Sequence, residues 1–308
     1  MDGVLVVDKP SGPTSHDVVA AARHALGLRK AGHLGTLDPL ATGVLPLVVG
    51  RATRLASLFA EARKQYDAVI RLGLITDSFD ITGSIVGGSG AGLLDPSSQT
   101  RAAWPDAGVI SAAAEDFVGS YLQRPPPVSA KKIGGVRAYE LARRHQPVEI
   151  SPVPVTVESL TLLAVEAHRV RCRVVCSSGF YVRSLAHDLG GKLGCGGCLE
   201  TLRRERHGPF RLDDAVPLEA LMDAGDAVAA RLVPMRDLLP DLPRVVVNAL
   251  GARRAAHGNP LGPGELVVAS LPTDLAGARI RVLDETGRLL AIAESGADGV
   301  LRPKIVLV

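Results

Sequence analysis

Apolar and polar side chains recur along this chain with the periods of both strands and helices. Residues 4–7 form a short apolar run that is typical of a buried strand, and residues 66–72 alternate apolar with charged positions. Between them, Ser15 is a suitable N-cap for a helix whose apolar positions continue to Leu26. A second helix is predicted over residues 52–64. This part of the chain therefore mixes helices with strands.

The middle of the chain continues this mixture. A helix is predicted over residues 110–122, and residues 155–165 and 168–176 alternate as the two strands of a hairpin do. Three arginines fall on one face of the second strand, where we expect them to meet solvent or RNA. A further helix follows, and its polar side is expected to present Arg183 and His187. The three strand arginines are Arg169, Arg171 and Arg173.

The expected domain organisation follows from the length of the chain and from a change in its composition. At 308 residues the chain exceeds the usual size of one compact domain. Beyond about residue 239, prolines interrupt short runs rich in valine and leucine, a pattern typical of a small β-rich domain. We therefore expect a larger domain over residues 1–239 and a smaller one over residues 244–308.

Composition and charge limit the location and the partners of the protein. Apolar residues make up 46% of the chain and aromatic residues only 3%, so the core must be aliphatic. The formal charge of +3 is too small to argue for a polyanionic partner, but two basic clusters suggest phosphate-facing surfaces. One cluster lies within residues 123–145, and the other consists of Arg203, Arg204, Arg206 and Arg211. No secretion signal and no run of 18 apolar residues occur, so we expect a cytoplasmic protein that makes no membrane contact.

The cysteines are too few for a disulfide framework in a chain of this length, and they fit reduced thiols. Cys195 and Cys198 have the spacing of half a zinc site, but no second pair or histidine partner completes it. We therefore expect no metal. The other two cysteines are Cys172 and Cys176.

Residues 29–50 are rich in glycine and contain two prolines within an apolar stretch, which predicts a shaped loop that runs into a strand. Asp38 is the only carboxylate in this stretch, and a carboxylate removed from water requires a partner. Pro39 also restricts the backbone of Asp38 to extended conformations. Because Asp-Pro is an ordinary start of a turn, these two residues alone leave the role of Asp38 open.

Residues 32–46, with the sequence GHLGTLDPLATGVLP, resemble the catalytic loop of the TruB family of pseudouridine synthases. Further segments similar to this family follow one another in the expected order, and they are residues 3–10, 64–66, 70–80, 123–143, 176–189 and 199–210. The resemblance implies an α+β fold, in which a pseudouridine synthase catalytic domain has a mixed, mainly antiparallel β-sheet flanked by helices and loops. The last 65 or so residues are similar to a PUA domain, a small RNA-binding β-barrel.

The resemblance implies isomerisation of uridine 55 in the T-loop of tRNA, without a cofactor and with the base flipped out of the RNA. Asp38 occupies the position of the catalytic aspartate, which acts on C1′ as a nucleophile or on C2′ as a base. Tyr66 matches a tyrosine that stacks on the target base; the alternative is an aromatic side chain packed on the core. Arg183 matches an arginine that pairs with the catalytic aspartate; the alternative is an exposed helix arginine.

The same resemblance implies contacts with RNA. His33 matches a loop histidine that enters the RNA where the base has left, and its alternative is a hydrogen bond within the loop. Lys64 and Asp80 are candidates for positioning RNA, with salt-bridge or turn roles as alternatives, and Lys9 is interpreted as structural. Residues 123–152 resemble a thumb loop that closes over the T-arm with basic residues on phosphates. The thumb residues expected to bind RNA are Lys131, Lys132 and Arg137.

The expected partner is the T-arm of tRNA, and the expected protein is a monomer without an obligatory protein partner. One alternative is a guide-RNA-dependent enzyme of the same superfamily, against which the long thumb with residues 138–143 argues. Another is a tRNA-folding chaperone without catalysis, but the presence of Asp38, Tyr66 and Arg183 together favours an enzyme. A nucleotide-binding protein is disfavoured because the chain has no Gly-x-x-x-x-Gly-Lys-Ser/Thr motif.

Overall fold

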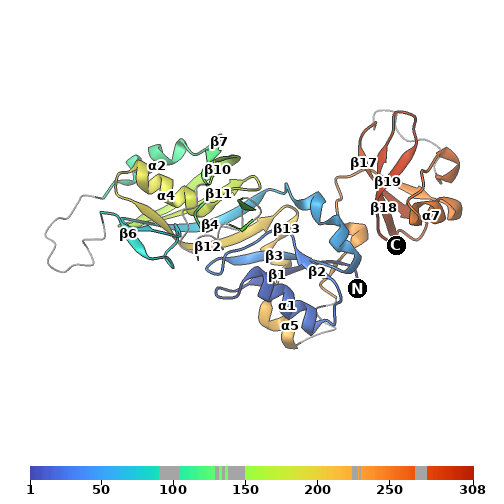
Figure 1. Cartoon of the computed structure of the whole chain (residues 1–308), viewed down its shortest axis with the longest axis horizontal. Helices are drawn as coiled ribbons and strands as arrows, with labels where there is room; N and C mark the ends of the chain where they lie inside the picture. The colour runs from blue at the N-terminus through green and yellow to red at the C-terminus, as the bar shows by residue number, and fades with distance from the viewer. Residues whose placement is uncertain are drawn as a thin grey trace.

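The computed structural model contains a large and a smaller β-sheet, which succeed one another along the chain (Figure 1). It describes residues 1–89, 104–128, 150–223, 228, 230–267 and 276–308, together with the backbone of residues 132–133 and 136–137. Within that part of the chain, no helix is long and apolar enough to cross a membrane.

Eleven strands of the described chain form one open, mixed sheet. Its main path runs β14-β1-β3-β12-β4-β11-β10-β7, and β15, β2 and β13 pair with β1, β3 and β12. β1 pairs with β14 and β3 pairs with β12 in parallel, whereas the other pairs are antiparallel. The α+β class with a mixed, mainly antiparallel sheet is therefore confirmed. The strands are β1 (Gly3–Lys9), β2 (Ala31–His33), β3 (Thr42–Val49), β4 (Lys64–Leu72), β7 (Gly119–Gln123), β10 (Val153–Glu166), β11 (Arg169–Cys176), β12 (Gly197–His207), β13 (Phe210–Arg211), β14 (Val216–Pro217) and β15 (Val233–Pro234).

Different elements cover the two faces of this sheet, because successive side chains of a strand point in opposite directions. Leu5 and Val7 of β1 belong to an apolar cluster that includes four helices. Val4 and Val6 belong to a second cluster, which includes a 3-10 helix, η1 (Gly50–Phe59), and side chains of the smaller sheet. The four helices are α1 (Ser15–Ala25), α2 (Ala107–Glu115), α4 (Val182–Lys192) and α5 (Leu218–Asp223).

The smaller sheet contains four strands of the described C-terminal part, in the order β16-β17-β18-β19, and we call it the C-terminal sheet. Its own apolar cluster includes Val247, Ile280 and Ala255, the last from helix α7. The β-rich character predicted beyond residue 239 is confirmed. The elements are β16 (Arg244–Val247), α7 (Ala249–Ala256), η5 (Pro263–Glu265), β17 (Arg279–Asp284), β18 (Leu289–Ser295) and β19 (Leu301–Val306). Two short hairpins complete the structure: β5 (Ile75–Thr76) with β6 (Ile85–Gly87), and β8 (Lys132–Ile133) with β9 (Val136–Arg137).

The two sheets are joined by apolar packing and by arginine hydrogen bonds, among them one from Arg54 of η1 to the carbonyl of Val306 in β19 at 2.5 Å. Leu289 of β18 and Leu55 of η1 belong to the same buried cluster, which also contains Met235 from the segment that links the sheets. Arg281 of β17 donates hydrogen bonds to three carbonyl oxygens of that linking segment. These carbonyls belong to Leu242, Arg236 and Pro240, at 3.1, 3.3 and 3.3 Å. The join is therefore a packed contact and not a free hinge.

The start of α1 differs from the prediction. Its N-cap is Thr14, whose hydroxyl accepts the N–H of Asp17 at 3.2 Å, while the Asp17 carboxylate accepts the N–H of Thr14 at 2.8 Å. Ser15 is instead the first residue of the helix and is buried. Two adjacent hydroxyl residues are equally suitable caps in sequence, and a tertiary contact of Ser15 decides between them.

Two predicted helices were also wrong in extent. Over residues 110–122, α2 ends at Glu115 and residues 119–123 form the edge strand β7, which pairs with β10. Gly119 makes the change of direction, because its φ of 101° lies in a region that favours glycine. Over residues 52–64, the structure has the 3-10 helix η1, which ends at Phe59, and β4 begins at Lys64.

Replacing Leu289 with alanine tests the join between the sheets. Leu289 is 1% exposed, so Leu289→Ala leaves a cavity and should lower the free energy of unfolding by about 2–5 kcal/mol. The control is Leu250→Ala, at a leucine that is 56% exposed, which should change that free energy by no more than about 0.5 kcal/mol. Urea denaturation followed by circular dichroism measures both variants. Equal urea midpoints for Leu289→Ala and Leu250→Ala would contradict the packed contact between the two sheets.

Candidate active site

Asp38 lies in the loop between β2 and β3, and hydrogen bonds hold the backbone on both sides of it. The Ser15 hydroxyl accepts the N–H of Leu37 at 2.8 Å and donates to the Leu37 carbonyl at 3.0 Å. On the other side, the Lys9 ammonium donates to the carbonyl of Ala41 at 2.7 Å. The side chain of Asp38 is nevertheless 38% exposed. The loop thus fixes the backbone of Asp38 and leaves its carboxylate accessible.

Lys9 itself is fully buried, which agrees with the structural role expected for it. Besides Ala41, its ammonium donates to the carbonyl of Pro39 at 3.3 Å and to that of Pro10 at 2.8 Å. Burial lowers the pKa of Lys9 to about 8. Carbonyl oxygens replace the water that this ammonium loses on burial, so Lys9 stabilises the conformation of the loop.

Arg204 of β12 holds the rest of the loop. Its guanidinium donates to two carbonyls of the loop and to one of β3, and Arg204 is 1% exposed. These carbonyls are those of Val44, Gly35 and Thr36, at 2.7, 3.0 and 3.3 Å. Gly43 of β3 allows the close approach of β3 to β12, because its φ is 99° and a Cβ there would lie 2.3 Å from the Arg204 carbonyl oxygen.

The burial of Arg204 contradicts the expectation that it faces phosphate within a basic cluster. Strand β12 alternates, so Arg204 lies on the same buried side as Leu202, whereas Arg203 points outward and pairs with Asp8 at 2.7 Å. The alternation of residues 202–204 is the signal that could have separated these two arginines in the sequence. Arg204 is therefore a residue of the site that sequence reasoning missed.

Arg183, the second residue of α4, forms a two-point ion pair with Asp38. Its Nη2 donates to Oδ1 of Asp38 at 3.1 Å, and its Nε lies 2.9 Å from Oδ2. The side chain of Arg183 is only 6% exposed, so the alternative of an exposed helix arginine is wrong. Arginine suits a carboxylate in this position because its planar fork matches two oxygens.

His187, expected on the same polar side of α4 as Arg183, is half-buried and stacks on Phe79 with ring centres 3.8 Å apart.

The turn at residues 78–80 supports Arg183 from the other side. Nη1 of Arg183 donates to the carbonyl of Ser78 at 3.0 Å and lies 3.6 Å from Oδ2 of Asp80. Oδ1 of Asp80 accepts from the Ser78 hydroxyl at 3.0 Å and from the N–H of Thr82 at 3.0 Å. Phe79 has a φ of 64°, a strained conformation for this residue type. The partners of Asp80 are thus those of a turn and ion-pair residue.

Tyr66 lies in β4, opposite Arg204 of β12, and is 7% exposed. It belongs to the apolar cluster on the helical face of the sheet, together with Leu37 and Ala41 from the loop of Asp38. Burial raises the pKa of the Tyr66 hydroxyl, and the neighbouring Arg204 opposes this shift. Tyr66 therefore carries a neutral hydroxyl at the edge of the Asp38 loop.

Two further expected residues flank this centre. His33 ends β2, and burial lowers its pKa to about 4, so its imidazole is neutral near neutral pH. Its ring meets that of His16 edge-on, with centres 5.5 Å apart. Lys64 begins β4 and donates to the carbonyl of Ala62 at 2.9 Å, and burial lowers its pKa to about 8.

The thumb residues are not brought into this site by the described structure. Lys131 lies outside the described residues, and Lys132 and Arg137 are described only as a backbone pair of the β8–β9 hairpin. The three arginines of β11 are partly exposed, as expected, and each pairs with a carboxylate of β4 or β12. The pairs are Arg169 with Glu200, Arg171 with Asp67 and Arg173 with Glu205.

The residues that could hold a metal do not gather in the described part of the chain, where no group of three or more His, Cys, Asp or Glu side chains forms. The cysteines are free and buried. Burial raises the pKa of Cys172 and Cys176 to about 12 and that of Cys198 to about 11, so these thiols are protonated.

The fold is shared with chains of two solved complexes. The structure is similar over 99% of the chain to a protein chain in "Crystal Structure of a Cbf5-Nop10-Gar1 Complex", with a TM-score of 0.73, 26% identity and 85% of that chain covered. It is also similar to a chain in "Structure of H/ACA RNP bound to a substrate RNA containing 2'-deoxyuridine", with a TM-score of 0.71, 25% identity and coverage of 99% and 85%.

The chain belongs to the TruB family. Residues 23–182 match the model of the TruB family pseudouridylate synthase N-terminal domain, and residues 183–240 match that of the tRNA pseudouridylate synthase B C-terminal domain. The chain is 43% identical over 100% of both sequences to tRNA pseudouridine synthase B of Solibacter usitatus. It is 42% identical to tRNA pseudouridine synthase B of Burkholderia pseudomallei, over 100% of this chain and 97% of that one.

Removing the Ser15 hydroxyl tests the clamp on the Asp38 loop. Ser15→Ala leaves the N–H and the carbonyl of buried Leu37 without their partner, so the free energy of unfolding should fall by about 1–3 kcal/mol. Ser57→Ala, at an exposed serine of η1, is the matched control and should stay within about 0.5 kcal/mol. Thermal and urea unfolding measure the stability of both variants. Equal stabilities of Ser15→Ala and Ser57→Ala would rule out the clamp.

Proposed function

We propose that this chain converts uridine 55 in the T-loop of tRNA to pseudouridine, with Asp38 as the catalytic carboxylate. The observation that carries the proposal is the ion pair between the partly exposed carboxylate of Asp38 and the buried guanidinium of Arg183. A reactive carboxylate must be accessible to the ribose, whereas the cation that pairs with it must lie in the protein interior. In this pair the anion is 38% exposed and the cation 6%, which is the required asymmetry.

The chemistry proposed for Asp38 is the one that the family resemblance implies, and the geometry of the ion pair supports it. The carboxylate acts on the ribose, at C1′ as a nucleophile or at C2′ as a base, and the detached uracil turns and rejoins through carbon. Once the base covers the loop, Asp38 loses water, and Arg183 then provides the compensating charge at about 3 Å. The residues that clamp the loop keep this carboxylate in one place, so little reorganisation is needed during the reaction.

Access to the ribose requires a flipped base, because the reacting atoms lie inside the RNA stack. Tyr66 borders the Asp38 loop and is proposed to stack on the extruded uracil. His33 is proposed to fill the vacated position in the RNA. Lys64 and Asp80 are proposed to position the RNA, Asp80 through Arg183.

The proposed substrate is tRNA, for which the relatives give the support. Proteins named tRNA pseudouridine synthase B are 41–43% identical to this chain over at least 99% of its length. The solved chains from H/ACA particles are 25–26% identical. This difference favours the stand-alone enzyme over the guide-RNA-dependent alternative. The ion pair at Asp38 favours an enzyme over a chaperone, because RNA binding alone needs no carboxylate at the mouth of a site.

The remaining parts of the chain are proposed to bind RNA around this centre. Residues 1–239 would form the catalytic domain, residues 123–152 its thumb with Lys131, Lys132 and Arg137, and residues 244–308 a PUA-like RNA-binding domain. The similarity to the chain in the Cbf5-Nop10-Gar1 complex extends over 99% of this chain and so includes the C-terminal sheet. We propose a cytoplasmic monomer that needs no cofactor, metal or protein partner.

The direct test is to incubate the protein with unmodified tRNA and to map pseudouridine. Asp38→Asn should reduce the rate by at least about 10²-fold, because it removes the reactive carboxylate but keeps its shape. Its tRNA affinity should stay within about tenfold, since phosphate contacts dominate binding. Asp241→Asn, at an exposed aspartate, is the control and should react normally. More than a few per cent of wild-type activity in Asp38→Asn would refute the assignment.

The Arg183 pair predicts a second, separable effect. Arg183→Lys keeps a positive charge but loses the two-point contact with Asp38, so the single-turnover rate at saturating enzyme should fall more than about tenfold while tRNA affinity changes little. Lys192→Met removes a charge from the exposed end of the same helix and should leave this rate unchanged. An Arg183→Lys rate within about threefold of wild type would show that the ion pair does not sustain the reaction.

A further inference from the structure

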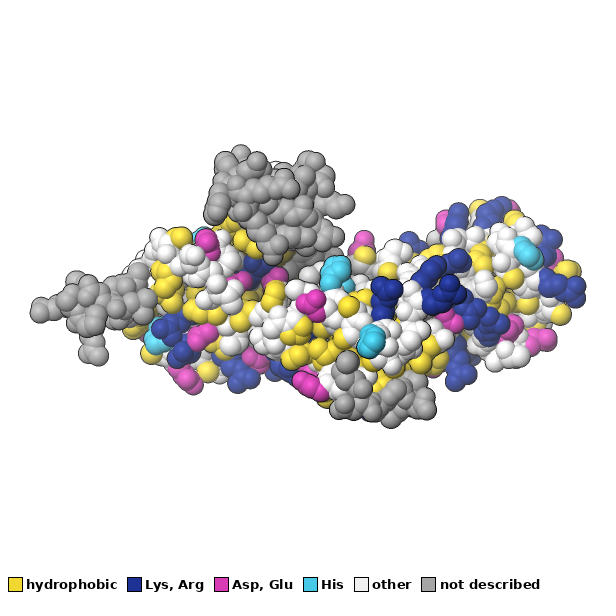
Figure 2. All heavy atoms as spheres, turned by 60° about the horizontal axis from the view of Figure 1, so that its bottom comes forward, with side chains coloured by type: hydrophobic (Ala, Val, Ile, Leu, Met, Phe, Trp, Pro, Cys, Tyr) yellow, Lys and Arg dark blue, Asp and Glu magenta, His cyan; other side chains and the backbone are white. Residues whose placement is uncertain are grey.

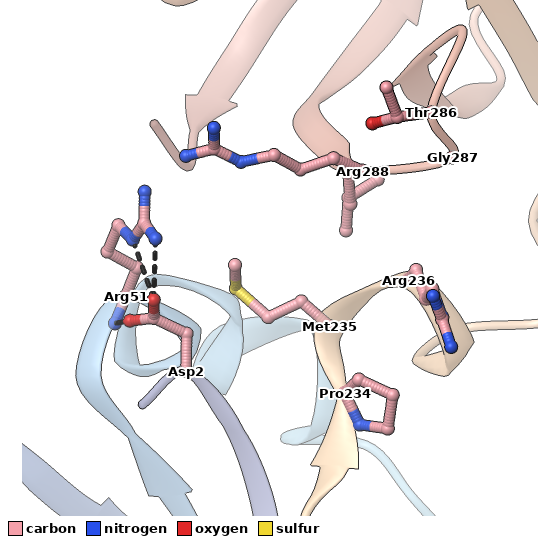
Figure 3. Close-up of a pocket in the computed structure, with 9 residues that line it drawn as sticks. Asp2, Arg51, Pro234, Met235, Arg236, Thr286, Gly287 and Arg288 are labelled. Atoms are coloured by element: carbon pink, nitrogen blue, oxygen red, sulfur yellow. Dashed lines mark hydrogen bonds and ion pairs between the residues drawn. The ribbon is translucent and has the colours of Figure 1, made fainter.

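A pocket of about 470 Å³ lies where the main sheet meets the C-terminal sheet (Figure 3). One wall comes from the start of β1 and of η1, with Asp2 and Arg51, and the facing wall comes from the turn before β18, with Arg288. Met235 lies between the two walls, and Arg236 stands beside it. The catalytic proposal uses none of these residues.

The pocket has an excess of positive charge. Three arginines but only one carboxylate line it. That carboxylate belongs to Asp2, which forms an ion pair with Arg51. Oδ2 of Asp2 accepts from Nη2 of Arg51 at 2.6 Å and from its Nε at 3.0 Å. Arg236 is 63% exposed, and its nearest acid, Asp237, is 3.8 Å away. After the Arg51–Asp2 and Arg236–Asp237 pairs are counted, Arg288 is the arginine of the pocket that has no ion pair with any residue the structure describes.

Arg288 is the arginine with most capacity for a ligand. Its guanidinium makes no hydrogen bond or ion pair with any residue that the structure describes, and it extends over the pocket toward Arg51 (Figure 3). The Asp284 carboxylate of the same turn accepts the backbone N–H groups of Thr286 and Arg288, at 3.0 and 2.9 Å, and lies near enough to the Arg288 side chain to interact with its charge. Two guanidinium groups that face one opening repel each other unless an anion lies between them.

The walls of the pocket are held at a fixed separation. Leu289, the residue after Arg288, and Met235 belong to the apolar cluster that joins the two sheets. Arg281 ties the carbonyl of Arg236 to β17 at 3.3 Å. The arginines are therefore preorganised, so binding an anion there requires little ordering of the protein.

We propose that this pocket binds a phosphodiester of the RNA substrate, remote from the nucleotide that reacts. The arginines are in contact with water: the Arg51 side chain is 40% exposed and that of Arg236 63%. A single small anion binds weakly under such exposure, whereas a polyanion presents neighbouring phosphates and releases its counterions. Lys and Arg side chains also gather on the surface where the main body meets the C-terminal part (Figure 2). This inference rests on the proposed function, because it takes the polyanion to be RNA.

The position of the pocket gives the contact its role. The Asp38 loop precedes β3 and Arg51 follows it, so the eight residues of β3, at about 3.3 Å each, place the two sites roughly 25 Å apart. A phosphate held there orients the RNA without touching the reacting uridine. Loss of this contact should therefore weaken binding and leave the chemical step unchanged.

Arg288→Gln and the double variant Arg236→Gln/Arg288→Gln test the proposal with unmodified tRNA. For Arg288→Gln, the slope of log affinity against log salt should fall by about one, and the dissociation constant at moderate salt should rise several-fold, further in the double variant. The single-turnover rate at saturating enzyme should stay within about twofold. Arg23→Gln removes the same charge from an exposed arginine of α1 that does not line the pocket, and its salt slope should match wild type.

A wild-type salt slope in the double variant would overturn the proposal, as would a slope change of equal size in Arg23→Gln. A loss of single-turnover rate would also overturn it, because the pocket would then act on the reaction and not on binding. Failure of the proposed function gives a different result: the wild-type protein would then form no pseudouridine in tRNA. Thermal unfolding of each variant should match wild type, since the replaced guanidinium groups are exposed.

Discussion

The ion pair between Asp38 and Arg183 joins residues that are 145 positions apart, and the candidate site depends on it. A carboxylate at the mouth of a site loses water when a ligand covers it, and a charge that loses water needs a partner already in place. Arg183 can serve because α4 packs against the main sheet and because the turn at residues 78–80 holds the other side of its guanidinium. The ion pair thus couples the helical layer to the Asp38 loop.

The loop itself is irregular and has no ladder of its own, so side chains from three regular elements satisfy its backbone. β1 provides Lys9, α1 provides Ser15 and β12 provides Arg204, and each binds loop carbonyl groups while being buried. Buried cations are costly unless donors and acceptors match, and here the carbonyls of the loop compensate for that cost. One arrangement therefore satisfies both partners, which explains how a glycine-rich loop can hold a carboxylate in a single position.

The opposite face of the main sheet serves a different purpose. There the 3-10 helix η1 and the C-terminal sheet share one apolar cluster, so the two sheets form a continuous body. The arginine-lined pocket at the join and the Asp38 loop are therefore held at a fixed separation. Fixed separations allow a distant phosphate contact to orient a nucleotide at the reaction centre without any conformational change in the protein.

Local patterns in the sequence determined most elements, the aliphatic core, the β-rich C-terminal part and Asp38 as the carboxylate of interest, because alternation, helical spacing and a family motif are properties of neighbouring residues. Tertiary structure alone decided that Thr14 caps α1 while Ser15 binds Leu37, that residues 119–123 join the sheet edge, and that Arg204 is buried beside exposed Arg203. Whether a hydroxyl or a cation faces water depends on a partner far along the chain. That partner is specified only when the strands and helices have packed.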